Sequence, residues 1–216
     1  MHLLAALLVV ALVQAFFVKI YQVPSVSMEN TLLPGDRLLV NRLAYTSEDP
    51  QVGDIVVFER PDEWRGDAPQ RGTLRTVVGW FGDIFGFGPS NSDALVKRVI
   101  AGPGDTVSCC STEGSLERNG QPIEEDYLGS DLPFEPGILD CEDGERSQRC
   151  FAPLTIPDDN YLMLGDNRAN SSDGISLCRG GEADDSSGCA RLVSREDIVG
   201  EVFFVVLPLS RWGAPQ

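Results

Sequence analysis

Five short runs of β-branched and apolar residues recur along the chain, and turn-forming Gly-Asp or Pro-Gly pairs separate several of them. The runs are residues 37–41 (RLLVN), 54–58 (DIVVF), 95–101 (LVKRVIA), 161–164 (YLML) and 198–207 (IVGEVFFVVL). The turns stand at residues 34–36, 53–54, 103–105 and 165–166. Such spacing favours antiparallel strands. With 216 residues, 42% of them hydrophobic, the chain can bury a core, so we predict a mainly β fold, a sandwich or barrel.

The most apolar segment lies at the N-terminus, where residues 3–18 are apolar except for Gln14. As a helix this run spans about 24 Å, just short of the ~30 Å hydrocarbon core of a bilayer. If the helix continues to Ile20, and the Lys19 side chain extends toward the interface, the helix is nearly as long as the core is thick. We therefore predict a single transmembrane anchor over residues 1–20.

A cleaved signal peptide is the alternative interpretation of the same segment, with residues 13–15 (VQA) as its cleavage site. However, no Lys or Arg precedes the apolar run, and apolar residues continue past Ala15. By the positive-inside rule, Lys19 alone would place the end of the anchor that carries it in the cytoplasm. The six cysteines argue for the opposite side, because disulfides persist in an oxidising compartment. We therefore expect residues 21–216 to form a domain on the extracytoplasmic side of the cell membrane.

The chain has six cysteines in polar, loop-like surroundings: Cys109, Cys110, Cys141, Cys150, Cys178 and Cys189. Their spacing lacks the tight C-x2-C pairs of a zinc site, so we expect no metal and no cofactor. Disulfides fit better. The short local loops favour the pairs Cys141–Cys150 and Cys178–Cys189, which leaves Cys109 and Cys110 either as a vicinal disulfide or as two thiols.

Charge and composition limit the partners and divide the rest of the chain. The 33 Asp and Glu residues outnumber the 17 Lys and Arg residues, for a formal charge of −16. This argues against a nucleic-acid partner, because phosphate binding needs a basic surface. Residues 108–153 are polar and rich in Gly and acidic side chains, and we predict a peripheral, cysteine-containing subdomain there. Residues 21–107 and 154–210 then form the core of the domain.

Residues 63–88 form an irregular insertion into this predicted core. The insertion carries several aromatic side chains within a short distance along the sequence, namely Trp80, Phe81, Phe85 and Phe87. A short amphipathic helix would place these rings on one side. Packing against the rest of the domain is one interpretation of that side, and contact with a membrane surface is the other.

Two serines, Ser25 and Ser27, follow the predicted anchor closely. A serine hydroxyl is a weak nucleophile until a base removes its proton, and the usual base is histidine. The only histidine, His2, precedes the apolar segment, which excludes a Ser-His-Asp triad. Arginine stays protonated and cannot substitute. An Asp or Glu base remains conceivable, and a lysine can act as the base if burial lowers its pKa.

Only Lys97 is placed to be such a lysine, because Lys19, the other lysine of the chain, lies at the membrane edge. In a strand over residues 95–100, alternation puts Lys97 and Val99 on the same face, among apolar neighbours that favour a neutral amine. Lowering the lysine pKa by two to three units costs roughly 3–4 kcal/mol of lost charge solvation. The alternative is a lysine in a salt bridge at a strand end, with the two serines only forming a turn.

Residues 25–32 (SVSMENTL) resemble the S-x-S-M-x-P-T-L box of bacterial type I signal peptidases, also called leader peptidases, a Ser/Lys peptidase family. Further motifs follow in the order found in that family: residues 35–41 (GDRLLVN), 53–58 (GDIVVF), 97–105 (KRVIAGPGD) and 165–173 (GDNRANSSD). Residues 200–207 fit its closing strand. Each motif is weak alone, but their common order gives the resemblance its weight.

The resemblance implies an antiparallel β-sheet peptidase domain behind an N-terminal anchor, and a serine endopeptidase activity. Ser27 is then the nucleophile that attacks the scissile carbonyl, and the uncharged Lys97 is the general base. The backbone N–H of Ser27 and the hydroxyl of Ser25 form the oxyanion hole. The implied substrates are signal peptides of exported preproteins, bound as an added β-strand with small residues at positions −1 and −3.

The resemblance also assigns supporting roles. Ser171 is expected to orient the Lys97 amine, Asp173 to be a structural carboxylate beside the site, and Met28 to help place the site near the lipid bilayer. We expect the protein to act as a monomer.

Two positions depart from the family pattern. Asn30 stands where the family usually has proline, which we expect only to loosen a turn. The family's box usually reads D-S-R from this aspartate, but Asp173 is followed by Gly174 and Ile175, so the arginine that normally pairs with the aspartate is missing. Three other arginines are candidates to replace it: Arg98, Arg168 and Arg179. The loop between Cys178 and Cys189 resembles extracytoplasmic loops of actinobacterial members.

Two other classes of function compete with this hypothesis. Repressors that cleave themselves use the same dyad, but they are cytosolic, and the anchor, the acidity and the cysteines argue against them. A membrane-tethered binding or assembly factor on the same scaffold is the non-catalytic alternative, and the missing arginine after Asp173 is its only support.

Overall fold

The computed structural model of the 216-residue chain describes residues 17–61, 64, 93–142, 145–181 and 186–215. Most of the predicted anchor and the aromatic insertion lie outside these residues. Among the described residues, no helix is long and apolar enough to cross a membrane.

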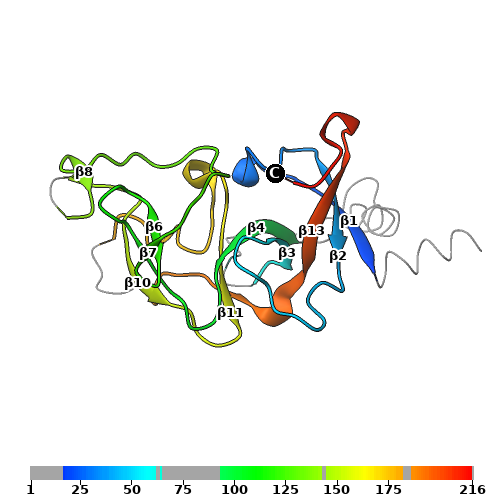
Figure 1. Cartoon of the computed structure of the whole chain (residues 1–216), viewed down its shortest axis with the longest axis horizontal. Coiled ribbons are helices and arrows are strands. Elements are labelled where there is room, and N and C mark those ends of the chain that lie inside the picture. The colour runs from blue at the N-terminus through cyan, green and yellow to red at the C-terminus, as the bar shows by residue number, and fades with distance from the viewer. Residues whose placement is uncertain (1–16, 62–63, 65–92, 143–144, 182–185, 216) are drawn as a thin grey trace, which may run out of the picture.

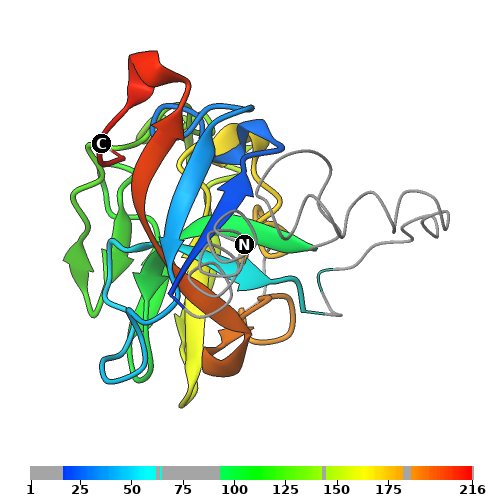
Figure 2. The same cartoon turned by 90° about the vertical axis from the view of Figure 1, so that its right-hand side faces the viewer.

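The larger part of the fold is a seven-stranded sheet in which every neighbouring pair of strands is antiparallel (Figures 1 and 2). In spatial order its strands are β1 (Val18–Gln22), β2 (Arg37–Asn41), β13 (Ile198–Leu207), β3 (Ile55–Glu59), β4 (Ala94–Ala101), β11 (Asn160–Leu164) and β12 (Val193–Ser194). The five strands predicted from the sequence are therefore confirmed to within one residue at each end.

The first strand, β1, corrects the predicted end of the anchor. Residues 18–20 were expected to complete the membrane segment, but Val18 pairs with Asn41 and the ladder continues to Gln22. The backbone of this stretch is thus engaged with β2 and belongs to the sheet. Figure 2 shows β1, in dark blue, at the edge of the sheet next to β2.

Strand β4 runs through the middle of the core, and its last six residues are all buried. Its two faces pack into different apolar clusters: Val96 lies with Leu38 and Val57, and Val99 lies with Phe58 and Met163. Because both faces are covered, a polar side chain on β4 is removed from water whichever way it points.

A second, four-stranded antiparallel sheet forms the other lobe, at the left of Figure 1. Its strands in spatial order are β10 (Phe151–Thr155), β5 (Thr106–Cys109), β6 (Leu116–Arg118) and β7 (Gln121–Pro122), and a short parallel pair, β8 (Leu139–Asp140) with β9 (Glu145–Arg146), stands beside it. One apolar cluster joins the sheets, since Val107 and Phe151 pack with Ile100 and Leu164.

Short 3₁₀ turns connect several of the strands, and η1 carries the predicted site. The described turns are η1 (Val26–Met28), η3 (Arg168–Asn170), η4 (Arg195–Asp197) and η5 (Leu209–Arg211). The chain after η1 returns to β2 through Gly35, whose φ of +95° suits a residue without a side chain. The Asp36 carboxylate fixes this return, because it accepts hydrogen bonds from the Leu33 N–H and from Arg211 Nε.

Candidate active site

Both serines of the first motif lie at η1. Ser25 precedes the turn in an extended conformation, and Ser27 is its middle residue. Their hydroxyl oxygens are 3.3 Å apart, so the two hydroxyls lie within hydrogen-bond distance of each other. Met28, the last residue of η1, is only 1% exposed and packs into the core. Its side chain therefore holds the turn against the sheet and does not face a lipid surface.

Gly165 brings η1 close to the fourth motif. A Cβ atom on this residue would stand 2.4 Å from the Ser27 carbonyl oxygen and 2.4 Å from Ser171 Oγ, so only glycine fits here. The Asn167 N–H donates to the same Ser27 carbonyl at 3.1 Å. The backbone of the predicted nucleophile is thus attached to the segment that carries Ser171.

Lys97 is buried on β4, with 2% of its surface exposed. Its Nζ donates a hydrogen bond to Ser171 Oγ at 2.9 Å. Burial lowers the pKa of Lys97 from 10.5 to about 8; the negative charges of Asp173 and Asp166 raise this pKa, and the positive charge of Arg191 lowers it further. Because burial is the largest cause, the amine is brought within reach of its neutral form at mildly alkaline pH.

Ser27 and Lys97 lie on elements that contact each other, η1 and β4. No direct hydrogen bond joins the Lys97 amine to the Ser27 hydroxyl, although both residues are among those described. Instead the structure links them through Gly165 and Ser171, which touch the Ser27 carbonyl and the Lys97 amine respectively.

A buried ion pair that sequence reasoning missed lies beside the lysine. Arg98 donates from Nε and Nη2 to the two oxygens of Asp166, at 2.9 and 2.7 Å, and from Nη1 to the Gly53 carbonyl. The Thr31 hydroxyl donates to the same carboxylate at 2.5 Å. All of these residues belong to the recognised motifs, but sequence order alone does not say which arginine meets which carboxylate.

Asp173 is fully buried, and the arginine that pairs with it is Arg179. Arg179 Nη2 lies 3.2 Å from Asp173 Oδ2. The other two candidates have other partners, since Arg98 binds Asp166 and Arg168 binds Glu125. Arg179 therefore occupies the place of the missing arginine, from a position six residues along the chain instead of the usual two.

A second arginine, which sequence reasoning did not single out, supports the same segment. Arg191 Nη2 donates to the Asp173 carbonyl at 2.9 Å and to Ser172 Oγ at 3.1 Å, and it also contacts the hydroxyl of Ser176. Arg179 and Arg191 flank the Cys178–Cys189 disulfide, whose Cα atoms are 5.2 Å apart. The disulfide thus closes the segment that brings both arginines to Asp173.

All six cysteines are paired. The structure confirms the predicted Cys141–Cys150 and Cys178–Cys189 disulfides and shows Cys109–Cys110 as a vicinal pair. The Sγ atoms of Cys110, Cys141 and Cys150 lie within 4.8 Å of one another. Because all three are in disulfides, they offer no thiolate, and this donor set does not fit a metal ion.

Asn30 does more than loosen a turn. Its φ is +94°, which the ring of a proline could not adopt, and its amide donates to the carbonyls of Tyr127 and Leu128. The residue that departs from the family pattern thus fastens the second lobe to the turn that follows η1.

The described groups combine a partly exposed hydroxyl, a second hydroxyl next to it, and a buried amine of lowered pKa. A neutral amine can accept a hydroxyl proton, and hydroxyl and backbone N–H donors can stabilise a developing oxyanion. This arrangement is suited to acyl transfer.

Comparison with known proteins agrees with this chemistry. The family model for signal peptidase, peptidase S26, matches residues 1–207. A signal peptidase I of Mycobacterium tuberculosis (strain ATCC 25618 / H37Rv) is 35% identical over 92% of this chain and 68% of its own length. A probable signal peptidase I-1 of Synechocystis sp. (strain ATCC 27184 / PCC 6803 / Kazusa) is 34% identical over 98% of this chain and 83% of its own length.

A signal peptidase I P of Bacillus subtilis subsp. natto is 30% identical over 97% of this chain and 88% of its own length. The crystal structure of a signal peptidase I from Enterococcus faecalis V583 aligns with a TM-score of 0.39 and 23% identity, over 72% of this chain and 97% of that one. That similarity is too low to add to the fold described above. The family model and the relatives, which span nearly the whole chain, establish that it belongs to the signal peptidase family, peptidase S26, and is a peptidase of the signal peptidase I type.

Proposed function

We propose that the chain is a membrane-anchored serine endopeptidase that removes signal peptides from exported preproteins, with Ser27 as nucleophile and Lys97 as general base. The observation that carries the mechanism is the buried amine of Lys97, with a pKa of about 8, bound to Ser171 beside the turn that holds Ser27. No other described lysine is buried, since Lys19 is only partly covered on β1.

In this mechanism the neutral Lys97 amine takes the Ser27 proton as Oγ attacks the scissile carbonyl. The Ser27 N–H and the Ser25 hydroxyl stabilise the oxyanion of the tetrahedral intermediate. When the C–N bond breaks, the Lys97 ammonium gives its proton to the leaving amine, and an acyl group stays on Ser27. Lys97 then takes a proton from water as the water oxygen attacks the acyl carbon. When the bond between this carbon and Ser27 Oγ breaks, Lys97 returns the proton to Oγ, and the signal peptide leaves with a free carboxylate.

The outer edge of β1, beside which the described residues contain no further strand, supports a mode of substrate binding. β1 is the first strand of the seven-stranded order and leads into Ser25 and Ser27. An extended substrate can add to such an edge through main-chain hydrogen bonds. We place the signal-peptide side of the substrate along β1, with small residues at −1 and −3 next to the site, because β1 directly follows the proposed anchor.

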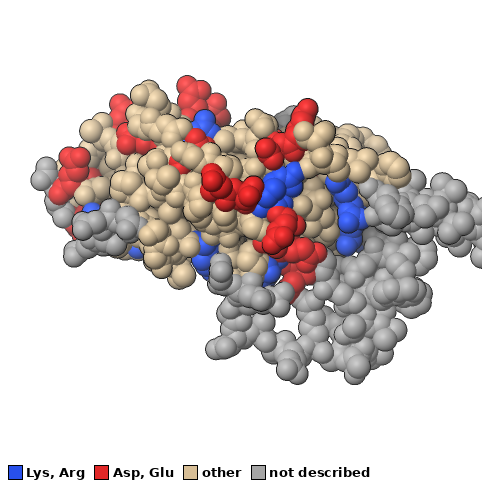
Figure 3. Space-filling model, turned by 90° about the horizontal axis from the view of Figure 1, so that it is seen from below, with Lys and Arg blue, Asp and Glu red and all other residues tan. Residues whose placement is uncertain are grey.

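Exposed apolar side chains support contact between this edge and a bilayer. Val26, next to the nucleophile, is 40% exposed, and Leu209 and Trp212, in and just after η5, are 69% and 61% exposed. We propose a membrane anchor in the residues before β1, which begins at Val18, and an extracytoplasmic domain after it. On the face seen in Figure 3, basic side chains lie next to acidic ones.

The test of the mechanism is cleavage of a purified preprotein, with small residues at −1 and −3, by the full chain in detergent. Ser27→Ala and Lys97→Met should each lower kcat/KM by at least about a thousandfold, since each removes a group that acts in the reaction. Ser47→Ala is the matched control, because Ser47 is exposed in the loop after β2. Near-normal cleavage by Lys97→Met, with wild-type circular dichroism, would exclude the dyad.

The same assay separates enzyme from binding factor, because a non-catalytic chain would leave the preprotein intact. The pH profile adds a second criterion. Since only the neutral Lys97 is a base, kcat/KM should rise through pH 8 and level off above it. A rate that is flat from pH 6 to pH 10 contradicts the assignment of Lys97.

A further inference from the structure

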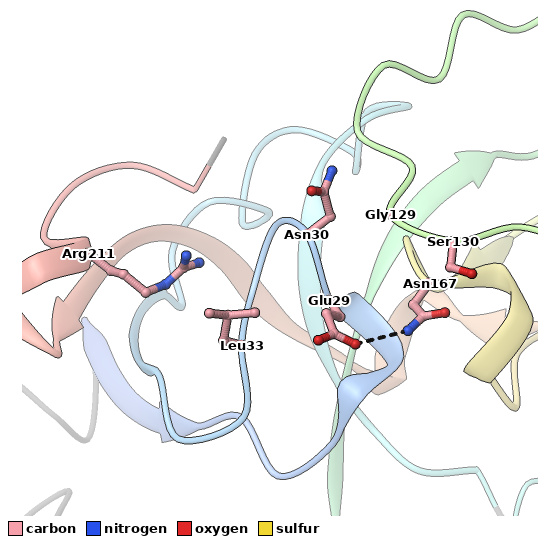
Figure 4. Close-up of a pocket in the computed structure, with 7 residues that line it drawn as sticks. All are labelled: Glu29, Asn30, Leu33, Gly129, Ser130, Asn167 and Arg211. Carbon is pink, nitrogen blue, oxygen red and sulfur yellow. Dashed lines mark hydrogen bonds between the residues drawn. The ribbon is translucent and has the colours of Figure 1, made fainter.

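A hollow of about 430 Å³ lies beside the turn that follows η1, and none of the roles assigned above uses it. Four parts of the chain form its walls: the turn after η1, a loop of the second lobe, the residue before η3, and the end of η5. The lining residues are Glu29, Asn30, Leu33, Gly129, Ser130, Asn167 and Arg211 (Figure 4). The volume is in the range of sites that hold a few residues of a peptide or a small ligand.

The walls are fixed by contacts of the turn after η1 with the start of η3 and with the loop of the second lobe. Asn167 donates from its backbone to the Ser27 carbonyl and from its side chain to Glu29 Oε2 at 3.3 Å. A Cβ on Gly129 would stand 2.6 Å from the Glu29 carbonyl oxygen, so the loop lies tightly against this turn. The hollow is therefore part of the same rigid assembly that positions Ser27.

The charges in the hollow are unequal. Arg211 donates to the Asp36 carboxylate and to the Thr31 carbonyl, so its charge is largely compensated. Glu29 is exposed and, among the described residues, meets the Asn167 amide but no cation. As Figure 4 shows, its carboxylate stands between Leu33 and Asn167 at one side of the hollow. A ligand in this hollow therefore meets one uncompensated negative charge.

We propose that this hollow binds the first residues of the mature segment of the preprotein, and that Glu29 makes it favour a basic over an acidic side chain there. The proposal rests on the proposed function. If the signal-peptide side lies along β1 and the scissile carbonyl is at Ser27, the mature segment must continue past η1. Glu29 follows Ser27 by two residues, at most about 7 Å of chain. An extended substrate covers about 3.3 Å per residue, so positions +2 and +3 reach Glu29.

The experiment uses one preprotein in three forms that carry Lys, Gln or Glu at +2, and a second set that varies +3. The full chain should cleave the Lys form with the highest kcat/KM in at least one set. Glu29→Gln should lower the Lys-to-Glu ratio of kcat/KM in that set about two- to fivefold, as for a solvent-accessible ion pair. Glu29→Lys should reverse the preference, and added salt should weaken it in the wild type.

The matched control is Glu196→Gln, which changes the net charge by the same amount. Glu196 is exposed on η4, at the opposite edge of the molecule from η1 in Figure 1. This variant should keep the wild-type ratio. An equal change of the Lys-to-Glu ratio in both variants would show a general effect of the acidic chain and would overturn the proposed role of Glu29. An unchanged ratio in Glu29→Gln would overturn it too, and so would a wild-type preference for the Glu form. Failure to cleave even the Gln forms would instead contradict the proposed function.

Discussion

Two carboxylates stand near Lys97, and the protein holds them in different ways. Asp166 is bound by Arg98, which makes two hydrogen bonds to it and is fixed in β4 by the pairing of β3, β4 and β11. Asp173 is bound by Arg179 through a longer contact of 3.2 Å, from a segment that the Cys178–Cys189 disulfide closes. The first pair depends on strand register and the second on a covalent link outside the sheet.

The comparison shows how a neutral lysine can be kept next to two negative charges. Both carboxylates raise the pKa of Lys97, which opposes the effect of burial. An arginine on each carboxylate offsets its charge, and Arg191 lowers the lysine pKa directly. The sheet supplies one arginine, and the other two lie just after the cysteines of the Cys178–Cys189 disulfide. We therefore expect the sheet-held pair to matter mainly for stability and the other arginines mainly for the titration of Lys97.

The largest effect is expected from Arg98→Met. It leaves the buried Asp166 carboxylate without its cation, which typically costs about 3–5 kcal/mol of folding free energy. Arg179→Met should cost less, because Arg179 makes fewer and longer bonds. Urea unfolding of the two variants at pH 7 measures the difference. An equal or larger loss for Arg179→Met would break the distinction between the two pairs.

The next effect concerns the cost of burying Lys97. Its folded pKa of about 8 lies below the unfolded 10.5, so the unfolded chain binds more protons between these values and stability should rise with pH there. The full shift corresponds to about 3 kcal/mol. Lys97→Met removes this cost but leaves the Ser171 hydroxyl without its donor, so we expect it to be about 1–3 kcal/mol more stable than wild type at pH 6–7.

Thermal unfolding of wild type and Lys97→Met between pH 6 and pH 11 checks this expectation. The advantage of the variant should be constant below pH 8 and should decrease as the pH rises toward 10.5, because the wild-type lysine is then neutral in both states. A difference that does not change with pH would mean that the lysine is not titrating in the folded chain.

The third prediction compares two disulfides. Each closes a short loop, with sequence separations of 9 for Cys141–Cys150 and 11 for Cys178–Cys189. Replacing either pair by serines should therefore cost a similar amount, about 2–3 kcal/mol. Only the loss of Cys178–Cys189 should also move the pH profile of kcat/KM, because only this pair holds Arg179 and Arg191. Equal profiles for the two double variants would contradict the role given to this segment.

The five strands predicted from the sequence are all part of the seven-stranded sheet. Short apolar runs between turns specify strands. Because β4 is one of these strands and its last six residues are buried, the pattern also predicted the apolar surroundings of Lys97. β1 was missed because its residues continue a longer apolar run with no turn before it. The sequence offered Arg179 only as one of three candidate partners of Asp173. A loop closed by a disulfide has no periodic pattern, so the sequence does not show which of its residues meet. Gly165 and Asn30 show their roles only through close packing and backbone conformation.

The smallest effect, and the most specific one, is expected from Arg191→Met. Removing this positive charge takes away an influence that lowers the pKa of Lys97, so the pKa should rise. The rising limb of the kcat/KM profile should then move a few tenths of a pH unit to higher pH. Arg191→Lys keeps the charge and should restore the wild-type midpoint, although it cannot reproduce the hydrogen bonds to Ser172 and Asp173. A merely structural arginine would lower the rate in both variants without moving the midpoint. A shift in Arg191→Met that Arg191→Lys reverses would therefore show that the charge of Arg191 acts on the base itself.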